Sequence, residues 1–316
     1  MAKKEGKNEH SGRGLHNAAL RESFVSGDFK GLLKVVKEDD ELIFQIRNNY
    51  VNIYYQGGCL AKVKERSIQF DENFFISAET KKDGWNHDQC LKKKKEWLEE
   101  LNKDKDYEKY VANMKEIMEK HWDWLKNRPN DSRDYSEKNV QQLLCASNKE
   151  DSDYTIIDLE FEVSKNSKYG YEKTGNGRVC RENKKPRFDI IAVRNSDKQL
   201  CVIELKCGIG ALRGDAGLGD HADSFEGTIK RNPKPFVTEI KKIVQDKSDL
   251  ELLSKGFSIS EKAPEFMFAF VASEKETEKQ EWDEMLKQMR EQNCTMYKVM
   301  KLETGGNYRL GNECRL

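Results

Sequence analysis

The spacing of apolar and polar positions changes along the chain, and the change predicts two differently built parts. Short runs that mix β-branched and aromatic residues occur at 41–46, 50–55 and 60–63, and Gly57-Gly58 separates the last two runs. A glycine pair between such runs is typical of a tight hairpin. We therefore predict a small antiparallel meander, which the apolar positions around 67–70 extend.

Residues 89–127 have a helical period and a high charge. Apolar side chains recur there at a spacing of three and four, at 107, 110, 111, 114, 117, 118, 121, 122 and 125. This spacing places one apolar stripe on a long helix. The sequence Arg128-Pro129-Asn130-Asp131 then ends the pattern. We expect the helices of this region to pack on the rest of the molecule, with a homodimer contact as the alternative.

The remainder of the chain alternates strand and helix patterns. In chain order the predicted elements are a helix at 136–146, strands at 154–163, 188–193 and 200–206, a helix at 236–253, a strand at 265–272, a helix at 279–292 and a strand at 294–302. Such an order is typical of an α/β domain. We divide the chain into a disordered start at 1–15, an N-terminal α+β region at 16–131 and a C-terminal domain at 132–316.

Composition limits the choice of partners and compartments. The chain has 56 Lys and Arg and 56 Asp and Glu residues, so its net charge is zero and any basic surface must be local. None of the eight cysteines forms a C-x-x-C pair, which argues against a zinc ribbon or a thioredoxin-type site. The sequence has no apolar run of membrane-spanning length and does not begin like a secretory leader. We expect a cytoplasmic protein without a membrane partner.

Two of the predicted strands carry charges where a core strand would be apolar. Asp189 stands within the run 188–193, and Glu204 and Lys206 interrupt the run 200–206. An unpaired buried charge costs several kcal/mol. Because side chains alternate along a strand, Glu204 and Lys206 share one face while Leu205 points to the other. In a chain rich in Glu and Lys, a bare Glu-x-Lys usually marks a solvated strand, so the apolar context is what favours a functional site.

This element order, with Asp189 on the second strand and Glu204-Leu205-Lys206 on the third, resembles the PD-(D/E)xK nuclease superfamily. The resemblance covers about residues 132–303 and leaves the first 130 residues unassigned. One departure is that Pro186 stands three residues before Asp189 instead of directly before it. The resemblance implies a restriction-endonuclease-like αβββαβ(αβ) core with a mixed sheet, and hydrolysis of phosphodiester bonds with Mg²⁺ or Mn²⁺ as cofactor.

The chemistry of these residues agrees with that expectation. Mg²⁺ binds through one or two carboxylates and keeps several waters, so Asp189 and Glu204 are predicted metal ligands. Lys206 beside them is predicted to orient the attacking water and to stabilise the charge of the transition state. The superfamily often takes a further ligand from its first helix, where Glu137 is the candidate. A first-turn glutamate favoured by the helix dipole is an equal alternative.

The segment 164–187 contains eight Lys or Arg and two Glu residues, a local net charge of +6. It links the first two predicted strands of the C-terminal domain. A basic segment with tyrosines suits phosphate contacts and base stacking, although an ordinary solvated loop is the alternative. The residues predicted to bind nucleic acid are Arg178, Arg181, Lys184, Lys185 and Arg187.

Four further features have weaker interpretations. A glycine-rich stretch at 208–219 reads as a mobile segment, and His221 beyond it either touches phosphate or water or has a structural role. Asp158, Glu160 and Glu162 alternate on one strand, and we expect at least two of them to be solvated. The meander contains four aromatic or basic side chains of interest, Arg47, Tyr50, Tyr54 and Tyr55. We expect several of them in the core, although exposed ones would suit stacking on a single strand or contact with a partner surface.

The sequence thus predicts a metal-dependent nuclease of the kind seen in repair or defence, with an added N-terminal region. The alternative is a catalytically silent module that keeps the nuclease fold to bind nucleic acid or protein. A small-molecule hydrolase has little support, because no G-x-S-x-G motif occurs. DNA and RNA remain equal candidates for the substrate.

Overall fold

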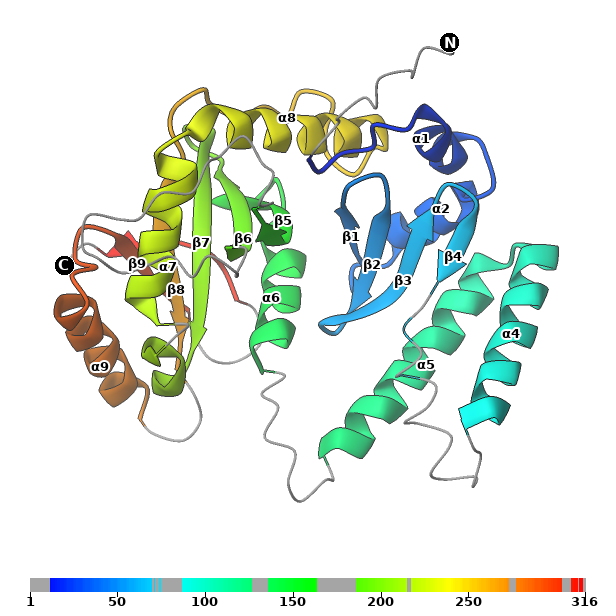
Figure 1. The fold of residues 1–316 in the computed structure, drawn as a ribbon, viewed down its shortest axis with the longest axis horizontal. Helices are drawn as coiled ribbons and strands as arrows, with labels where there is room; N and C mark the ends of the chain where they lie inside the picture. The colour runs from blue at the N-terminus through cyan, green and yellow to red at the C-terminus, as the bar shows by residue number, and fades with distance from the viewer. Residues whose placement is uncertain are drawn as a thin grey trace, which may run out of the picture.

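The structure is a computed structural model that describes residues 12–69, 71, 74, 87–126, 136–163, 186–214, 217–272, 277–302, 308–311 and 313–314. It contains two sheets that lie side by side, one in the N-terminal part and one in the C-terminal part (Figure 1). Among the described residues, no helix is both long and apolar enough to cross a membrane.

The N-terminal sheet is the predicted meander. It follows the helices α1 (Ala18–Val25) and α2 (Lys30–Glu38) and has four antiparallel strands, β1 (Ile43–Ile46), β2 (Val51–Tyr55), β3 (Gly58–Lys64) and β4 (Ser67–Gln69), in the order β1-β2-β3-β4. Gln56 and Gly57 both have positive φ in the turn from β2 to β3. Two-residue hairpin turns require this conformation, which explains the glycine at 57.

Two helices, and not one long helix, fill the charged region. They are α4 (His87–Asp104) and α5 (Tyr107–Lys126), and Lys105 between them has φ 56°. The predicted apolar stripe lies on α5, where Tyr107, Met114 and Met118 are buried. This face packs against α2 and β3, so the stripe serves the core of the N-terminal part.

The C-terminal part has the predicted order of elements. Its helices are α6 (Ser136–Ser147), α7 (Leu218–Phe225), α8 (Pro233–Asp249) and α9 (Glu278–Glu291), with the short turns η1 (Ile209–Leu212) and η3 (Glu226–Lys230). Its strands are β5 (Tyr154–Glu162), β6 (Arg187–Arg194), β7 (Gln199–Cys207), β8 (Glu265–Val271), β9 (Lys298–Leu302) and β10 (Glu313–Cys314). The strand order is β10-β9-β8-β7-β6-β5. Because β7-β8-β9 are parallel and the other pairs antiparallel, the sheet is mixed.

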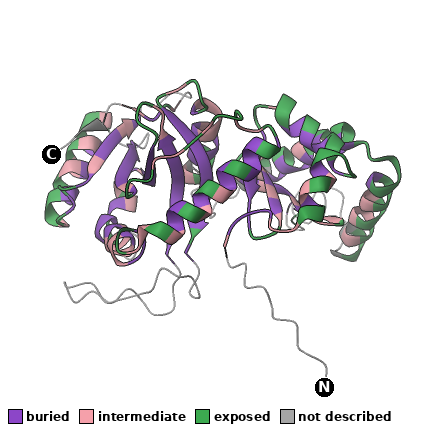
Figure 2. Ribbon diagram, turned by 90° about the horizontal axis from the view of Figure 1, so that it is seen from above, coloured by how far each residue is buried: buried purple, intermediate pink, exposed green. Residues whose placement is uncertain are grey.

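Helices cover both faces of this sheet. Leu200 and Val202 of β7 belong to the core cluster that includes Phe236 of α8, whereas Ile203 and Leu205 belong to the cluster that includes α6. Figure 2 shows the resulting layers, with buried strands between helices whose outer sides are exposed. By alternation, Glu204 and Lys206 share the face of Leu200 and Val202.

Asp158 differs from the other two acids of β5. Its side chain is fully buried and forms ion pairs with Arg13 and with Arg47, whose Nη1 lies 2.7 Å from Asp158 Oδ1. The register shift of β5 lies between Ile156 and Asp158, so all three acids follow it in one register. Asp158 is buried because Arg13 and Arg47 cover it from distant segments. Glu160 is half-buried and Glu162 is exposed, in line with the expectation for two of the three acids.

Long-range contacts also hold residues that were predicted to be disordered. Arg13 and Leu15 are buried, although both fall within the range 1–15 that was expected to be disordered. The Leu15 backbone N–H donates to Asp246 Oδ2 at 2.7 Å, and Arg13 donates to Asp158. These partners stand on α8 and β5, so long-range polar contacts fix a segment whose own sequence looks unstructured.

The buried ion pairs lead to a stability prediction. Asp158→Asn should lower the free energy of unfolding by about 3–5 kcal/mol, because two buried guanidinium groups lose their counter-ion. Urea denaturation measures this change. The matched control is Asp40→Asn, since Asp40 forms an ion pair with Lys149 on the surface and its side chain is 83% exposed. Equal unfolding midpoints for the two variants would contradict a stabilising role of the buried pairs.

Candidate functional site

The pairing of β6 with β7 brings the three predicted catalytic residues together. Ile190 pairs with Ile203, and extending this antiparallel register by one residue places Asp189 opposite Glu204. The side chains are almost fully buried, with exposed fractions of 7% for Asp189, 2% for Glu204 and 4% for Lys206. The strand pair, which is central in the sheet, therefore holds them rigidly.

Hydrogen bonds fix the two carboxylates in different ways. Glu204 Oε1 accepts from Lys206 Nζ at 2.9 Å and lies 3.0 Å from His221 Nδ1, which donates in the tautomer with the proton on that nitrogen. Asp189 Oδ2 accepts from the Leu205 backbone N–H at 2.9 Å. Glu204 Oε2 is buried and has no hydrogen-bond partner in the described structure. One carboxylate oxygen of the cluster thus lacks the donor that burial normally requires.

The electrostatics of the cluster are dominated by burial and by like charges. Burial and the charge of Glu204 raise the pKa of Asp189 well above its ordinary value. Burial also raises the pKa of Glu204, although the ammonium of Lys206 opposes that effect. Burial alone would lower the pKa of Lys206, but the neighbouring carboxylates outweigh it and the pKa is raised. Lys206 therefore carries its charge at neutral pH.

Glu137 and His221 complete the surroundings of the cluster. Glu137 stands in the first turn of α6, and burial together with the charge of Asp189 raises its pKa to about 7. His221 stands on α7, and burial together with the charge of Lys206 lowers its pKa to about 4. The imidazole is therefore neutral at pH 7. Three carboxyl groups then face a single ammonium, and their raised pKa values show that the site favours bound protons, or a cation in place of those protons.

The donor set fits a hard divalent cation. Carboxylate oxygens are the protein ligands that Mg²⁺ prefers, and one or two of them are enough because the ion keeps several waters. Glu204 Oε2, without a donor of its own, and the carboxyl group of Asp189 would hold the ion, with Glu137 as a further ligand. Across the described residues, no group of three or more His, Cys, Asp or Glu side chains is already arranged as a metal site.

Most of the predicted phosphate-binding segment falls outside the described residues. This applies to Arg178, Arg181, Lys184 and Lys185. Arg187 is described, and it is the exposed first residue of β6, with Nη1 3.7 Å from Glu160 Oε1. The predicted mobile stretch after β7 contains the 3₁₀ turn η1 instead of an irregular loop over its first residues.

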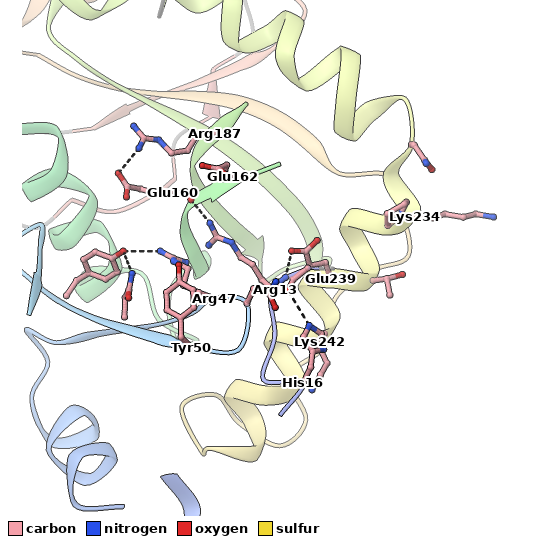
Figure 3. Close-up of a pocket in the computed structure, with 17 residues that line it drawn as sticks. Arg13, His16, Arg47, Tyr50, Glu160, Glu162, Arg187, Lys234, Glu239 and Lys242 are labelled. Atoms are coloured by element: carbon pink, nitrogen blue, oxygen red, sulfur yellow. Dashed lines mark hydrogen bonds and ion pairs between the residues drawn. The ribbon is translucent and has the colours of Figure 1, made fainter. Parts of the chain in front are cut away.

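A cavity of about 900 Å³ beside this cluster was not foreseen from the sequence. Its lining comes from the segment before α1, from the turn between β1 and β2, from β2, from the end of β5, from the start of β6 and from the first half of α8 (Figure 3). No local pattern joins such distant segments. One signal was present, because an aspartate within the apolar run 154–163 requires a cation from elsewhere in the chain.

Comparisons of the chain with protein-family models, with curated proteins and with solved structures found no match.

The raised pKa of Glu137 leads to a pH prediction. A carboxyl group whose pKa rises from 4.5 to about 7 on folding stabilises the fold below pH 4.5 and loses that contribution as the pH rises through 7. Glu137→Gln removes this loss, so the variant should be more stable than the wild type at pH 8 and similar at pH 4.5. Urea midpoints at both pH values test this, and Glu38→Gln on the surface of α2 is the control. Parallel pH curves for wild type and Glu137→Gln would contradict it.

Proposed function

We propose that the C-terminal part is a metal-dependent nuclease with a restriction-endonuclease-like core of the PD-(D/E)xK kind. The observation that carries the proposal is the buried, partnerless Oε2 of Glu204 beside the carboxyl group of Asp189. A buried oxygen of this kind is costly when no donor binds to it. Without metal, Asp189, whose pKa is raised, can share its proton with Glu204, and a cation would take the place of that proton. A divalent cation between the two carboxylates would satisfy that oxygen.

The architecture supports the proposal at a coarser level. A helix, three antiparallel strands, the two helices α7 and α8 and a parallel strand follow one another from α6 to β8, and the charged residues stand on the second and third of the antiparallel strands. These are the positions that the resemblance assigns to the catalytic residues. After β8, the strands β9 and β10 extend the same mixed sheet, and α9 connects β8 to β9.

The residues of the site have separate tasks in phosphodiester hydrolysis. Asp189 and Glu204 would hold Mg²⁺ or Mn²⁺, which when bound lowers the pKa of a ligated water and neutralises charge on the phosphate. Lys206 is held in place by its hydrogen bond to Glu204. Its ammonium orients the attacking water and stabilises the charge that develops on the phosphate oxygens. His221 donates to Glu204 and keeps that side chain in one orientation.

Substitutions in the cluster test the enzyme. Glu204→Gln and Asp189→Asn should abolish Mg²⁺-dependent cleavage because each removes a ligand charge. Lys206→Ala should retain metal binding yet slow cleavage by about 10²–10³-fold, a loss typical for removal of one group that stabilises the transition state. The assay offers plasmid, single-stranded DNA and RNA, each with Mg²⁺, Mn²⁺ or EDTA, and calorimetry follows Mn²⁺ binding.

A matched control is available on α5. Glu116 and Lys120 form an exposed carboxylate–ammonium pair with an O–N distance of 2.7 Å. Glu116→Gln and Lys120→Ala should cleave at the wild-type rate. If the wild type cleaves nothing with any metal, or if Glu204→Gln cleaves equally well, the enzyme is ruled out. The protein is then the alternative, a silent nuclease-fold module that binds nucleic acid or protein.

A further inference from the structure

The cavity of about 900 Å³ lies between the N-terminal sheet and the C-terminal part. Figure 3 shows that Arg47 and Tyr50 face it from the N-terminal sheet, Glu160 and Arg187 from β5 and β6, and Glu239 from α8. The volume falls in the upper part of the range for ligand pockets, roughly 300–1,000 Å³. The cavity is therefore large enough to bind a ligand.

One strand joins the cavity to the acidic cluster. Arg187 lines the cavity and Asp189 belongs to the cluster, and both stand on β6. Two residues of extended strand span about 7 Å, so Arg187 and Asp189 lie close together along β6, although Asp189 is buried and does not line the cavity. Arg187 is also near enough to Glu137 for its charge to lower the pKa of that group. A long ligand that meets Arg187 is therefore about 7 Å along the strand from the carboxylate cluster.

The aromatic side of the cavity is held rigidly. The Tyr54 hydroxyl oxygen accepts from Asn52 Nδ2 at 2.9 Å and from Arg47 Nη2 at 3.3 Å. The ring of Tyr50 has Lys62 Nζ 4.3 Å from its centroid. Lys62 covers one face of the Tyr50 ring, so the other face is the one a planar group can stack on. Rings fixed in this way lose little entropy when a ligand binds.

The charges of the lining suit a ligand that carries both anionic and hydrogen-bonding groups. Five Arg or Lys residues and three Glu residues line the cavity, an excess of two positive charges. Arg13 and Arg47 are held by Asp158 behind the wall, and Lys234 extends away from the other labelled residues (Figure 3). Arg187, with a side chain 59% exposed, is the cation best placed to meet a phosphate. The glutamates and asparagines suit the polar edges of bases.

We propose that this cavity binds a single-stranded segment of nucleic acid, with a base stacked on Tyr50 and a backbone phosphate paired with Arg187. A base can reach a ring inside a cavity only when it is unpaired, whereas a duplex keeps its bases stacked within the helix. The inference rests on the proposed function for the class of ligand, and it adds the strand state of the substrate and the path by which the strand reaches Asp189.

Binding without metal tests this inference separately from cleavage. Fluorescence anisotropy in EDTA compares a labelled oligothymidylate with a duplex of the same length. The single strand should bind more tightly. Tyr50→Ala should weaken its binding by about 10-fold, since stacking of one base contributes roughly 1–3 kcal/mol, while Tyr50→Phe should bind like the wild type. Arg187→Ala should weaken binding and reduce the slope of log K against log salt by about one.

The matched control for Arg187 is Arg66. Both are exposed arginines near one glutamate, and Arg66 is not among the residues that line the cavity. Equal effects of Arg187→Ala and Arg66→Ala would overturn the inference. So would equal binding of duplex, equal affinities of Tyr50→Ala and Tyr50→Phe, or a mononucleotide that binds as tightly as the oligonucleotide. Single-strand binding with these variant effects but without any cleavage supports the inference and rejects the nuclease, so the two failures are distinguishable.

Discussion

The arrangement of the two parts depends on one buried carboxylate. Asp158 of β5 is fully buried and is shared by Arg13 from the N-terminal segment and Arg47 from the N-terminal sheet. Backbone carbonyls accept the remaining guanidinium protons, among them Leu159 O, which both arginines reach. A buried charge is tolerated only when it is paired and hydrogen-bonded, so these contacts hold three distant segments in one geometry. The same geometry places Arg13 and Arg47 in the wall of the cavity.

Two buried charge clusters among the described residues differ in how they are satisfied. Asp158 receives hydrogen bonds from two guanidinium groups, and neither of its oxygens is among the partnerless buried atoms of the described residues. Glu204 pairs with Lys206 through one oxygen and keeps the other without a donor, and the neighbouring carboxyl groups of Asp189 and Glu137 have raised pKa values. Charges that only stabilise a fold tend to be compensated within it, whereas perturbed ones cluster at functional sites. This contrast is our physical reason to propose a structural role for the Asp158 cluster and a catalytic role for the Glu204 cluster.

The sequence predicted the strands and helices, which depend on neighbouring residues, and missed the contacts between residues that are far apart in the chain. The strands around Asp189 and Glu204 were predictable because alternation and apolar runs are local. The partners of Asp158 lie 145 and 111 residues away, so no window of the sequence joins them. Alternation grouped Asp158 with the more exposed Glu160 and Glu162, but Arg13 and Arg47 from distant segments bury Asp158. The break at Lys105, where φ is positive without a glycine, has one local signal in Asp106, whose side chain accepts from the Lys109 backbone N–H as an N-cap.

The pairing of β5 with β6 links the buried carboxylate to the candidate site. Asp158 pairs with Ile191 and Glu162 pairs with Arg187, so the positions that hold the arginines lie in register with the strand that carries Asp189. The same strand contributes Arg187 to the cavity. A shift of β5 relative to β6 would therefore move the cavity wall and the carboxylates together. Rigid strands suit this task because phosphoryl chemistry depends on positioning to within a fraction of an ångström. The ion pairs of Asp158 with Arg13 and Arg47 thus set the geometry on which the proposed cleavage and the proposed binding of a single strand both depend.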